Sequence, residues 1–445
     1  ALGIISVDEP DKLIAVRKES PLILGLGTDE MFIASDIPAV LPHTKRVIVI
    51  EDGEMVIVTP TKAIIKRVDS GEIVERKPLE VTWTIEMAEK RGYPHFMLKE
   101  IHEQPDAVRE TLRASLHELD RLCNMLLNAK RIYFVACGTA YHAALVGKYA
   151  LTRLTGLSAE VVISSEFQES CMADKDTVLL AISQSGETAD TLKAVKVAKA
   201  DGAKIACLTN VVGSSITRES DLVCHTYAGP EIGVAATKTF SAQVAYLLSL
   251  AIHLAEKQGR KSKEELNELT AQLHKIPETI RGTLQRVEPK VKDIAGRYKD
   301  ATNFYFIGRG IGYPIAMEGA LKLKEIAYIH SEATPAGELK HGPLALIQRG
   351  IPVVAVVVPG ASYGRMLGNV EEVKARGGEV IALAAEDDVE IEKHVTELIR
   401  ISKTHELLTP LTYIPPLQLL AYFISVERGL DPDRPRHLAK SVTVE

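Results

Sequence analysis

The pattern of apolar and polar residues separates a strand-rich beginning from a long remainder in which strands and helices alternate. Short β-branched runs occupy residues 2–6, 46–50 and 55–59, and Glu51–Glu54 between the last two is typical of a hairpin turn. We therefore expect a small β-rich unit over residues 1–80.

The remainder of the chain, from residue 111 onward, has the pattern of an α/β protein. Apolar runs recur there, with helix-like stretches among them, at residues 131–136, 160–163, 177–182 and 204–208. This alternation predicts a parallel sheet flanked by helices. Residues 81–110, where charged side chains accompany Gly92 and Pro94, are expected to be a linker.

An internal repeat divides this remainder into two. The pattern Tyr-Phe-x-x-x-Gly-x-x-Tyr occurs at residues 133–141 and again at 305–313. A Lys-Ala-x-Gly segment precedes an apolar run at residues 199–202 and again at 374–377. Two unrelated α/β domains would be the alternative explanation, but both landmarks occur in the same order. We therefore predict two tandem α/β units, at residues 111–275 and 276–445.

Composition narrows the class of protein. The chain has 445 residues, of which 46% are hydrophobic and 25% charged, as in ordinary globular proteins. Its net charge of −6 provides no basic field for nucleic acid or an anionic membrane. The five cysteines are scattered, without the spacing of a zinc site or a disulfide framework. No apolar stretch is long and uninterrupted enough to span a membrane. We expect a cytoplasmic protein without a metal.

The segment after the apolar run 177–182 has the composition of a phosphate-binding loop. It joins a strand to a helix N-terminus, where unpaired backbone N–H groups favour an anion, and Gly186 allows a close approach. No lysine follows as in a nucleotide-binding loop, so a phosphomonoester is indicated. An ordinary helix cap is the alternative. The second repeat, at 356–362, lacks most of these hydroxyls. The candidate ligands are Ser183, Gln184, Ser185 and Thr188.

Other segments carry titratable side chains whose meaning the pattern leaves open. Lys322 and Glu325 share one helix face with Glu318, either as a site or as a solvated ladder of ion pairs. His341 lies in a turn bounded by glycine and proline, where an imidazole can reach a ligand or be incidental. The 231–239 loop could line a ligand site or begin a helix with a solvent-facing Lys238. Lys440 lies in a basic tail, where the residues alone predict a solvated side chain.

Taken together, these motifs resemble one family. They are Cys-Gly-Thr at 137–139, Ser-Gln-Ser-Gly-Glu-Thr at 183–188, Glu-Ile-Gly-Val at 231–234, Glu-Leu-Lys-His-Gly-Pro at 338–343 and the tail at 438–445. Their order and the tail resemble the glutamine–fructose-6-phosphate aminotransferase (isomerising) family over residues 1–445. The resemblance implies two sugar isomerase (SIS) domains, preceded at residues 1–80 by the last part of an N-terminal-nucleophile glutaminase domain.

The resemblance also implies an activity and residue roles. The reaction would convert fructose 6-phosphate and glutamine-derived ammonia into glucosamine 6-phosphate, the first step of hexosamine biosynthesis, in a homodimer and without a cofactor. Lys440 would form a Schiff base with C2 of the sugar, and Glu325 would move a proton between C1 and C2, with Lys322 nearby. His341, from the partner subunit, would assist ring opening. Substrate contacts would come from the phosphate-loop residues and from Cys137, Gly138, Thr139, Val234 and Ala439.

Two departures from the family pattern qualify these expectations. Ala140 stands where family members have serine, which removes one hydroxyl from the expected sugar contacts. The resemblance implies an N-terminal cysteine as the glutaminase nucleophile, whereas Ala1 has no thiol or hydroxyl, so we expect this chain to carry only the synthase and isomerase activity.

Two other functions are compatible with tandem SIS domains. A deglycase or deaminase acting on fructosamine phosphates is the first, and the tail argues against it. A regulator that senses a sugar phosphate without turnover is the second. Such a regulator would need the phosphate loop, but not Glu325, His341 and Lys440 together.

Overall fold

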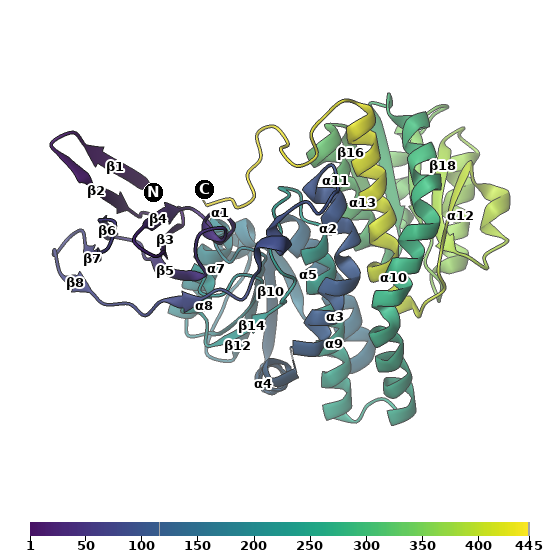
Figure 1. The fold of residues 1–445 in the computed structure, drawn as a ribbon. Helices are drawn as coiled ribbons and strands as arrows, with labels where there is room; N and C mark the ends of the chain where they lie inside the picture. Colours follow the sequence, from purple (N-terminus) through teal and green to yellow (C-terminus); the bar gives the residue numbers. More distant parts are fainter. Residues whose placement is uncertain (115, 444–445) are drawn as a thin grey trace.

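The computed structural model describes residues 1–114 and 116–443, which form an N-terminal β unit and two α/β units arranged side by side (Figure 1). The last two residues of the predicted tail, 444 and 445, lie outside the described residues. The described tail leaves the second α/β unit and runs across the molecule toward the N-terminal unit (Figure 1).

The N-terminal unit consists of two antiparallel sheets packed on an apolar core that includes Ala15, Leu24 and Val56. The first sheet has the order β1-β2-β6-β7-β8, with bounds Leu2–Ser6, Glu9–Val16, Glu54–Val58, Ala63–Arg67 and Ile73–Val74. The second has the order β4-β3-β5-β9, with bounds Met31–Ala34, Leu22–Leu26, Arg46–Ile50 and Leu79–Glu80, and the short helix α1 spans Ile37–Val40.

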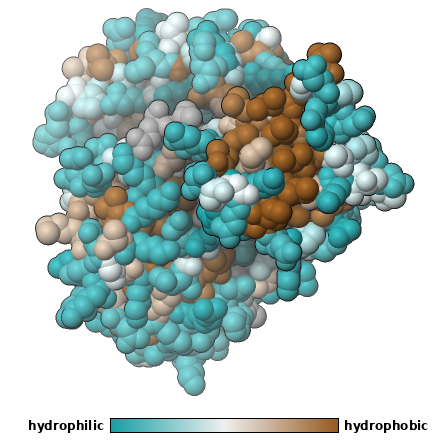
Figure 2. All heavy atoms as spheres, turned by 90° about the vertical axis from the view of Figure 1, so that its left-hand side faces the viewer, coloured by the Kyte–Doolittle hydropathy of each residue, from teal (hydrophilic) through white to brown (hydrophobic). Residues whose placement is uncertain are grey.

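The N-terminal unit exposes several apolar side chains at its outer strand β1. All residues of β1 are exposed, and Ile5 and Val7 are among the most exposed large apolar side chains of the unit. The side of the molecule that carries the N-terminal unit displays a gathered apolar patch (Figure 2).

The predicted hairpin at Glu51–Glu54 is wrong, because β5 and β6 belong to different sheets. The chain turns here around the buried side chain of Arg17, whose guanidinium donates to the carbonyl of Ile50 at 2.8 Å. The backbone N–H of Gly53 donates to the carbonyl of Arg17 at 3.0 Å. These contacts direct β6 to pair with β2 instead of with β5.

A helical segment links the N-terminal unit to the α/β units. It contains the 3-10 helix η1 and the helices α2, α3 and α4, with bounds Ile85–Ala88, Phe96–His102, Gln104–Ala114 and Leu116–Leu127. Helix α3 packs on α9 and α10, and α2 packs on α13, so this segment is part of the main core from Phe96 onward.

The first α/β unit is built on a parallel sheet of order β11-β10-β12-β13-β14. Its strands span Glu160–Ile163, Arg131–Ala136, Thr177–Ser183, Lys204–Thr209 and Leu222–His225. Its helices are α5, α6, α7, α8 and α9, with bounds Gly138–Thr155, Phe167–Ser170, Ala189–Ala200, Ser215–Glu219 and Lys238–Gln258, and η2 spans Ser164–Glu166. The central strand β12 is buried along its whole length, as its continuous apolar run predicts.

The second α/β unit repeats this order as β16-β15-β17-β18-β19, which confirms the predicted duplication and the α/β fold. Its strands span His330–Pro335, Asn303–Gly308, Pro352–Val356, Glu379–Ala385 and Glu397–Ile401. Its helices are α10, α11, α12 and α13, with bounds Lys263–Tyr298, Gly312–Ala327, Tyr363–Lys374 and Thr409–Glu427. The 3-10 helices η3, η4, η5 and η6 span Ala336–His341, Pro343–Leu346, Ile391–His394 and Glu406–Leu408.

The two sheets are joined by one continuous core of packed helices. Helix α5 packs on α9 and α11, and α13 packs on α10 and α11. Gly319 allows α11 and α13 to approach each other closely, because a Cβ at this position would lie 2.8 Å from the side chain of Leu417. The segment Glu406–Glu427 is long and apolar enough to cross a membrane by length and composition, but an 18-residue window of it is entirely buried inside the protein, as in the core helix of a globular protein.

Candidate active site

The Ser183–Thr188 loop is a compact turn at the carboxyl end of β12, as the sequence predicts. The hydroxyls of Ser183 and Thr188 lie 2.9 Å apart, and the backbone N–H of Gly186 donates to the Ser183 hydroxyl at 3.0 Å. Gly186 has a φ of 66°, and a Cβ there would lie 2.1 Å from the hydroxyl of Ser214. Only glycine fits this conformation and this space. The loop thus brings hydroxyls to the start of helix α7, where an anion is favoured.

The Cys137–Thr139 segment lies beside this loop. Strands β10 and β12 are parallel neighbours, with Ala136 opposite Ile182, so the residues that follow them meet at one edge of the sheet. The Cys137 thiol is 3.8 Å from the hydroxyl of Thr191 in α7. Gly138, with a φ of 51°, begins helix α5. The structure therefore brings the predicted sugar-binding segments together, although they are far apart in the sequence.

Thr139 connects this edge to the predicted acid/base residues of the second unit. Its hydroxyl donates to Glu318 Oε1 at 3.0 Å and accepts from Lys322 Nζ at 3.1 Å. Lys322 Nζ also lies 3.3 Å from Glu318 Oε1 and 2.6 Å from Glu325 Oε2. The side chains of Glu318 and Lys322 are fully buried, so the alternative of a solvated ion-pair ladder is wrong.

Burial and charge act in opposite directions within this cluster. Burial alone would raise the pKa of the Glu318 carboxyl, but Lys322, His142 and Thr139 stabilise the carboxylate and hold its pKa below the usual value. Burial would likewise lower the pKa of Lys322, but Glu318 and Glu325 raise it above the usual value. Lys322 is therefore an ammonium beside the Glu325 carboxylate, where it is suited to balance the charge of a base.

Lys440 is anchored by the first unit and not solvated. Its Nζ donates to Glu231 Oε2 at 2.5 Å and to the carbonyl of Gly233 at 2.8 Å, and its side chain is 22% exposed. Glu231 is buried and also accepts hydrogen bonds from the backbone N–H and hydroxyl of Thr239 at 3.1 and 2.7 Å. Burial would raise the pKa of Glu231, but the ion pair with Lys440 and these hydrogen bonds lower it to about 2.

A second buried carboxylate supports the loop that holds Lys440. Glu100, in α2, accepts hydrogen bonds from the backbone N–H groups of Ile232 at 2.6 Å and Gly233 at 3.3 Å. Burial, followed by the charge of Glu231, raises the pKa of Glu100 to about 7. Glu100 and Glu231 together fix the backbone around Gly233, and thereby one of the two acceptors of the Lys440 ammonium.

A cavity of about 350 Å³ opens at Lys440, between the N-terminal unit and the first α/β unit. Gln184, Ser185 and Glu231 line it beside Lys440, and Trp83 and Ile23 are among the residues that line its apolar part. The tail closes one side, because the backbone N–H of Ala189 donates to the carbonyl of Val442 at 3.0 Å. Lys440 and the predicted phosphate loop thus face one shared space.

The remaining predicted site residues lie at different depths. Val234 is half-buried in the loop after Glu231, and Ala439 is exposed next to Lys440. Ala140 packs against the main core. His341 is exposed at the end of η3 in the second unit, which suits a residue expected to act across a subunit boundary. Within the part of the chain that the structure describes, no group of His, Cys, Asp and Glu side chains is arranged to hold a metal ion.

Several residues at the site escaped the sequence analysis. Nothing local to Glu231 indicated that it would be the buried partner of Lys440. Glu318 was expected beside Lys322 on one helix face, but nothing local indicated that this pair would be buried. Glu100 and His142 carried no signal at all, because each is one polar residue in an ordinary helical pattern. Their partners lie 132 and 176 residues away.

Comparisons with known proteins show the family of this chain. The SIS domain family matches residues 125–253 and 297–428. Curated proteins named glutamine–fructose-6-phosphate aminotransferase (isomerizing) from Thermococcus kodakarensis and Methanothermobacter thermautotrophicus are 51% and 49% identical. Each alignment covers 100% of this chain, and 74% and 73% of the relatives respectively.

Solved structures show the same relationship. The C-terminal domain of glucosamine-fructose-6-phosphate aminotransferase from Francisella tularensis has a TM-score of 0.73 at 38% identity, over 78% of this chain and 100% of that one. A glucosamine-6-phosphate deaminase from Thermotoga maritima shares the fold, with a TM-score of 0.61 at 24% identity, over 78% of this chain and 99% of that one. From its full-length similarity and its paired SIS domains, the chain belongs to the glutamine–fructose-6-phosphate aminotransferase (isomerizing) family.

Proposed function

We propose that this chain converts fructose 6-phosphate and ammonia into glucosamine 6-phosphate. The names of its relatives give the reaction, and the single observation that carries it here is the position of Lys440. Its ammonium, held by Glu231 and Gly233, faces the same cavity as Gln184 and Ser185 of the phosphate loop. A sugar phosphate bound by the loop would therefore have an amine within its reach.

Each step of the reaction has a candidate group. The Lys440 ammonium would release one proton, and the resulting amine would add to the C2 carbonyl. That proton would return to the C2 hydroxyl as it leaves as water, which leaves a protonated imine that can accept electrons. Ammonia would then add to C2 and displace the lysine. Glu325 would take a proton from C1 and return it to C2, which yields an aldehyde at C1 and an amine at C2. Lys322 would balance the charge of Glu325 during the transfer.

Substrate binding would precede this chemistry. The phosphate would lie against the loop, and the sugar against the adjoining strand ends and the tail, which fixes C1 and C2 near the reacting groups. In this proposal the phosphate ligands are Ser183, Gln184, Ser185 and Thr188, and the sugar contacts are Cys137, Gly138, Thr139, Val234 and Ala439.

The assembly and the domain limits complete the proposal. We propose a cytoplasmic homodimer in which the partner subunit's His341 assists ring opening, since in one chain this residue is exposed at the end of η3. A glutaminase-like segment would occupy residues 1–80, followed by a linker at 81–110. The SIS domains would occupy residues 111–275 and 276–445, which contain the two matched regions.

Reductive trapping tests the role of Lys440. Borohydride added with fructose 6-phosphate should reduce the imine and attach a hexitol phosphate to Lys440, which peptide mass mapping would locate. Lys440→Arg should give no adduct, because a guanidinium forms no imine here. Lys238→Arg is the matched control: Lys238 is buried and paired with Glu103 at 2.7 Å, and its variant should trap normally. An adduct on a different lysine of the wild-type protein would remove the Schiff-base assignment.

Turnover separates this enzyme from a regulator with the same fold. The wild-type protein should interconvert fructose 6-phosphate and glucose 6-phosphate, and should form glucosamine 6-phosphate when ammonium chloride is added. A regulator would bind fructose 6-phosphate in a calorimeter without either product. Binding without turnover would therefore refute the proposed function.

A further inference from the structure

We propose that His142 is a positioning residue for the proton transfer, which it serves by holding Glu318 and thereby the ammonium of Lys322 against Glu325. The inference rests on the proposed function, because it assigns Glu325 the role of base. His142 belongs to helix α5 of the first unit, whereas Glu318, Lys322 and Glu325 belong to helix α11 of the second. The contact is therefore one of the links that join the phosphate-binding unit to the acid/base unit.

The geometry assigns each oxygen of Glu318 to different partners. Oε1 accepts from the Thr139 hydroxyl at 3.0 Å and lies 3.3 Å from Lys322 Nζ. Oε2 lies 2.7 Å from Nδ1 of His142. An ionised carboxylate only accepts hydrogen bonds, so Nδ1 of His142 must carry the hydrogen. The imidazole is itself buried, with 10% of its side chain exposed.

Charge explains why this hydrogen bond matters. The buried cluster holds the carboxylates of Glu318 and Glu325 and the single ammonium of Lys322. Both carboxylates compete for that ammonium. When His142 donates a hydrogen bond to Oε2, part of the negative charge of Glu318 is already stabilised. Lys322 is then not drawn toward Glu318 and stays 2.6 Å from Glu325. Without this donor, Oε2 would be a buried, unpaired carboxylate oxygen, and Glu318 would be drawn toward Lys322.

The expected consequence falls on catalysis and not on substrate binding. Lys322 and Glu325 act on the reacting carbons, whereas the proposed phosphate ligands lie in the Ser183–Thr188 loop on another element. Thr139 is the one proposed sugar contact that touches Glu318, and its hydroxyl keeps its second partner, Lys322. A shift of the ammonium away from Glu325 should therefore lower kcat and leave KM for fructose 6-phosphate nearly unchanged. A displacement of about 1 Å at a reacting group costs on the order of 100-fold in rate.

Two substitutions of equal shape isolate the hydrogen bond. His142→Asn places an amide N–H close to the position of Nδ1. The leucine of His142→Leu has nearly the same shape as that asparagine but carries no hydrogen-bond donor. We expect His142→Leu to lower the isomerase kcat by about 10- to 100-fold with KM within about 2-fold. His142→Asn should recover most of that loss. His253→Leu is the control. His253, in helix α9, pairs with Asp120 of α4 at 3.6 Å, and its replacement should leave kcat unchanged.

The possible outcomes distinguish a failure of this inference from a failure of the proposed function on which it rests. An active wild-type protein with equal kcat values for His142→Asn and His142→Leu would overturn the positioning role. A His142→Leu variant that loses kcat and raises KM in parallel would also overturn it, because it would indicate general disruption. If His142→Leu does not fold, a normal kcat for His142→Gln, whose amide extends past the Nδ1 position, would overturn it as well. A wild-type protein without isomerase activity would refute the proposed function itself.

Discussion

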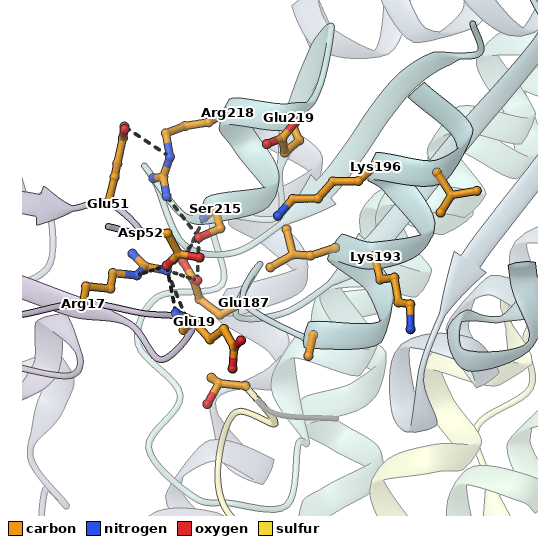
Figure 3. A pocket seen from close by; sticks show the side chains of 14 residues that line it. Arg17, Glu19, Glu51, Asp52, Glu187, Lys193, Lys196, Ser215, Arg218 and Glu219 are labelled. Carbon is orange, nitrogen blue, oxygen red and sulfur yellow. Dashed lines mark hydrogen bonds and ion pairs between the residues drawn. The ribbon is translucent and has the colours of Figure 1, made fainter. Parts of the chain in front are cut away.

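Arg17 of the N-terminal unit forms an ion pair with Glu187, which belongs to the Ser183–Thr188 loop, with a distance of 3.0 Å (Figure 3). The Arg17 side chain is only 2% exposed. Glu187 also accepts hydrogen bonds from the backbone N–H and the hydroxyl of Ser215, at 2.8 and 2.7 Å. The N-terminal unit thus directly contacts the loop that we propose to bind phosphate, at the edge of a cavity of about 770 Å³.

Replacing Arg17 should weaken substrate binding more than turnover. Arg17→Met keeps the aliphatic stem but removes the donor to Glu187, which leaves a mostly buried carboxylate less well paired. We expect KM for fructose 6-phosphate to rise about tenfold, equivalent to ~1.4 kcal/mol, with little change in kcat. Steady-state isomerase kinetics measure both constants. Arg46→Met, which breaks an exposed pair with Glu80 in the same unit, is the control. An unchanged KM would show that the loop does not depend on this contact.

Replacing Glu325 should abolish proton transfer without preventing substrate binding. Glu325→Gln has the same size but cannot accept the C1 proton, so kcat should fall by about 10²–10⁴-fold. Calorimetry should still detect fructose 6-phosphate binding. Glu332→Gln, at an exposed position in β16, should behave as the wild type. Retained turnover in Glu325→Gln would refute its role as the base.

Replacing Glu231 should release the tail. Glu231→Gln removes the charge that holds the Lys440 ammonium, and with it the ion pair between the tail and the first unit. Trypsin should then cleave after Lys440 several-fold faster, which mass spectrometry of the intact chain would follow. Glu219→Gln breaks a more exposed pair with Lys199 and should not change the rate. A tail that remains equally protected would mean that other contacts hold it.

Stability should depend on pH through Glu100. Its pKa is about 7 in the folded protein, above the ordinary value of 4.5, so the folded state binds more protons than the unfolded state between these pH values. The free energy of unfolding should therefore decrease as pH rises from about 4.5 to 7, by at most about 3 kcal/mol from this group. Glu100→Gln, which keeps both backbone hydrogen bonds, should reduce that decrease.

The measurement is denaturant unfolding at pH 5 and pH 8. The exposed residue Glu89 provides the control variant, Glu89→Gln, which should show the pH dependence of the wild type. If Glu100→Gln and the wild type lose the same stability between the two pH values, Glu100 is not the group that titrates.

The sequence alone determined the α/β architecture, its duplication and the place of the predicted phosphate loop. These features depend on local information: continuous apolar runs indicate buried strands, and a glycine with hydroxyls after such a run indicates a tight loop at a helix start. The structure confirms the paired sheets and the position of the Ser183–Thr188 loop at the end of β12.

Only the tertiary structure decided which polar side chains are buried and what they contact. The pattern around Lys322 suited a solvated helix face equally well, because periodicity does not say what will pack on a face. Lys440 meets Glu231 across 209 residues, and His142 meets Glu318 across 176. The turn at Glu51–Glu54 has the sequence of a hairpin, but the buried side chain of Arg17 packs against it. Such contacts arise when distant elements pack, and a buried charge needs its partner whatever their separation in the sequence.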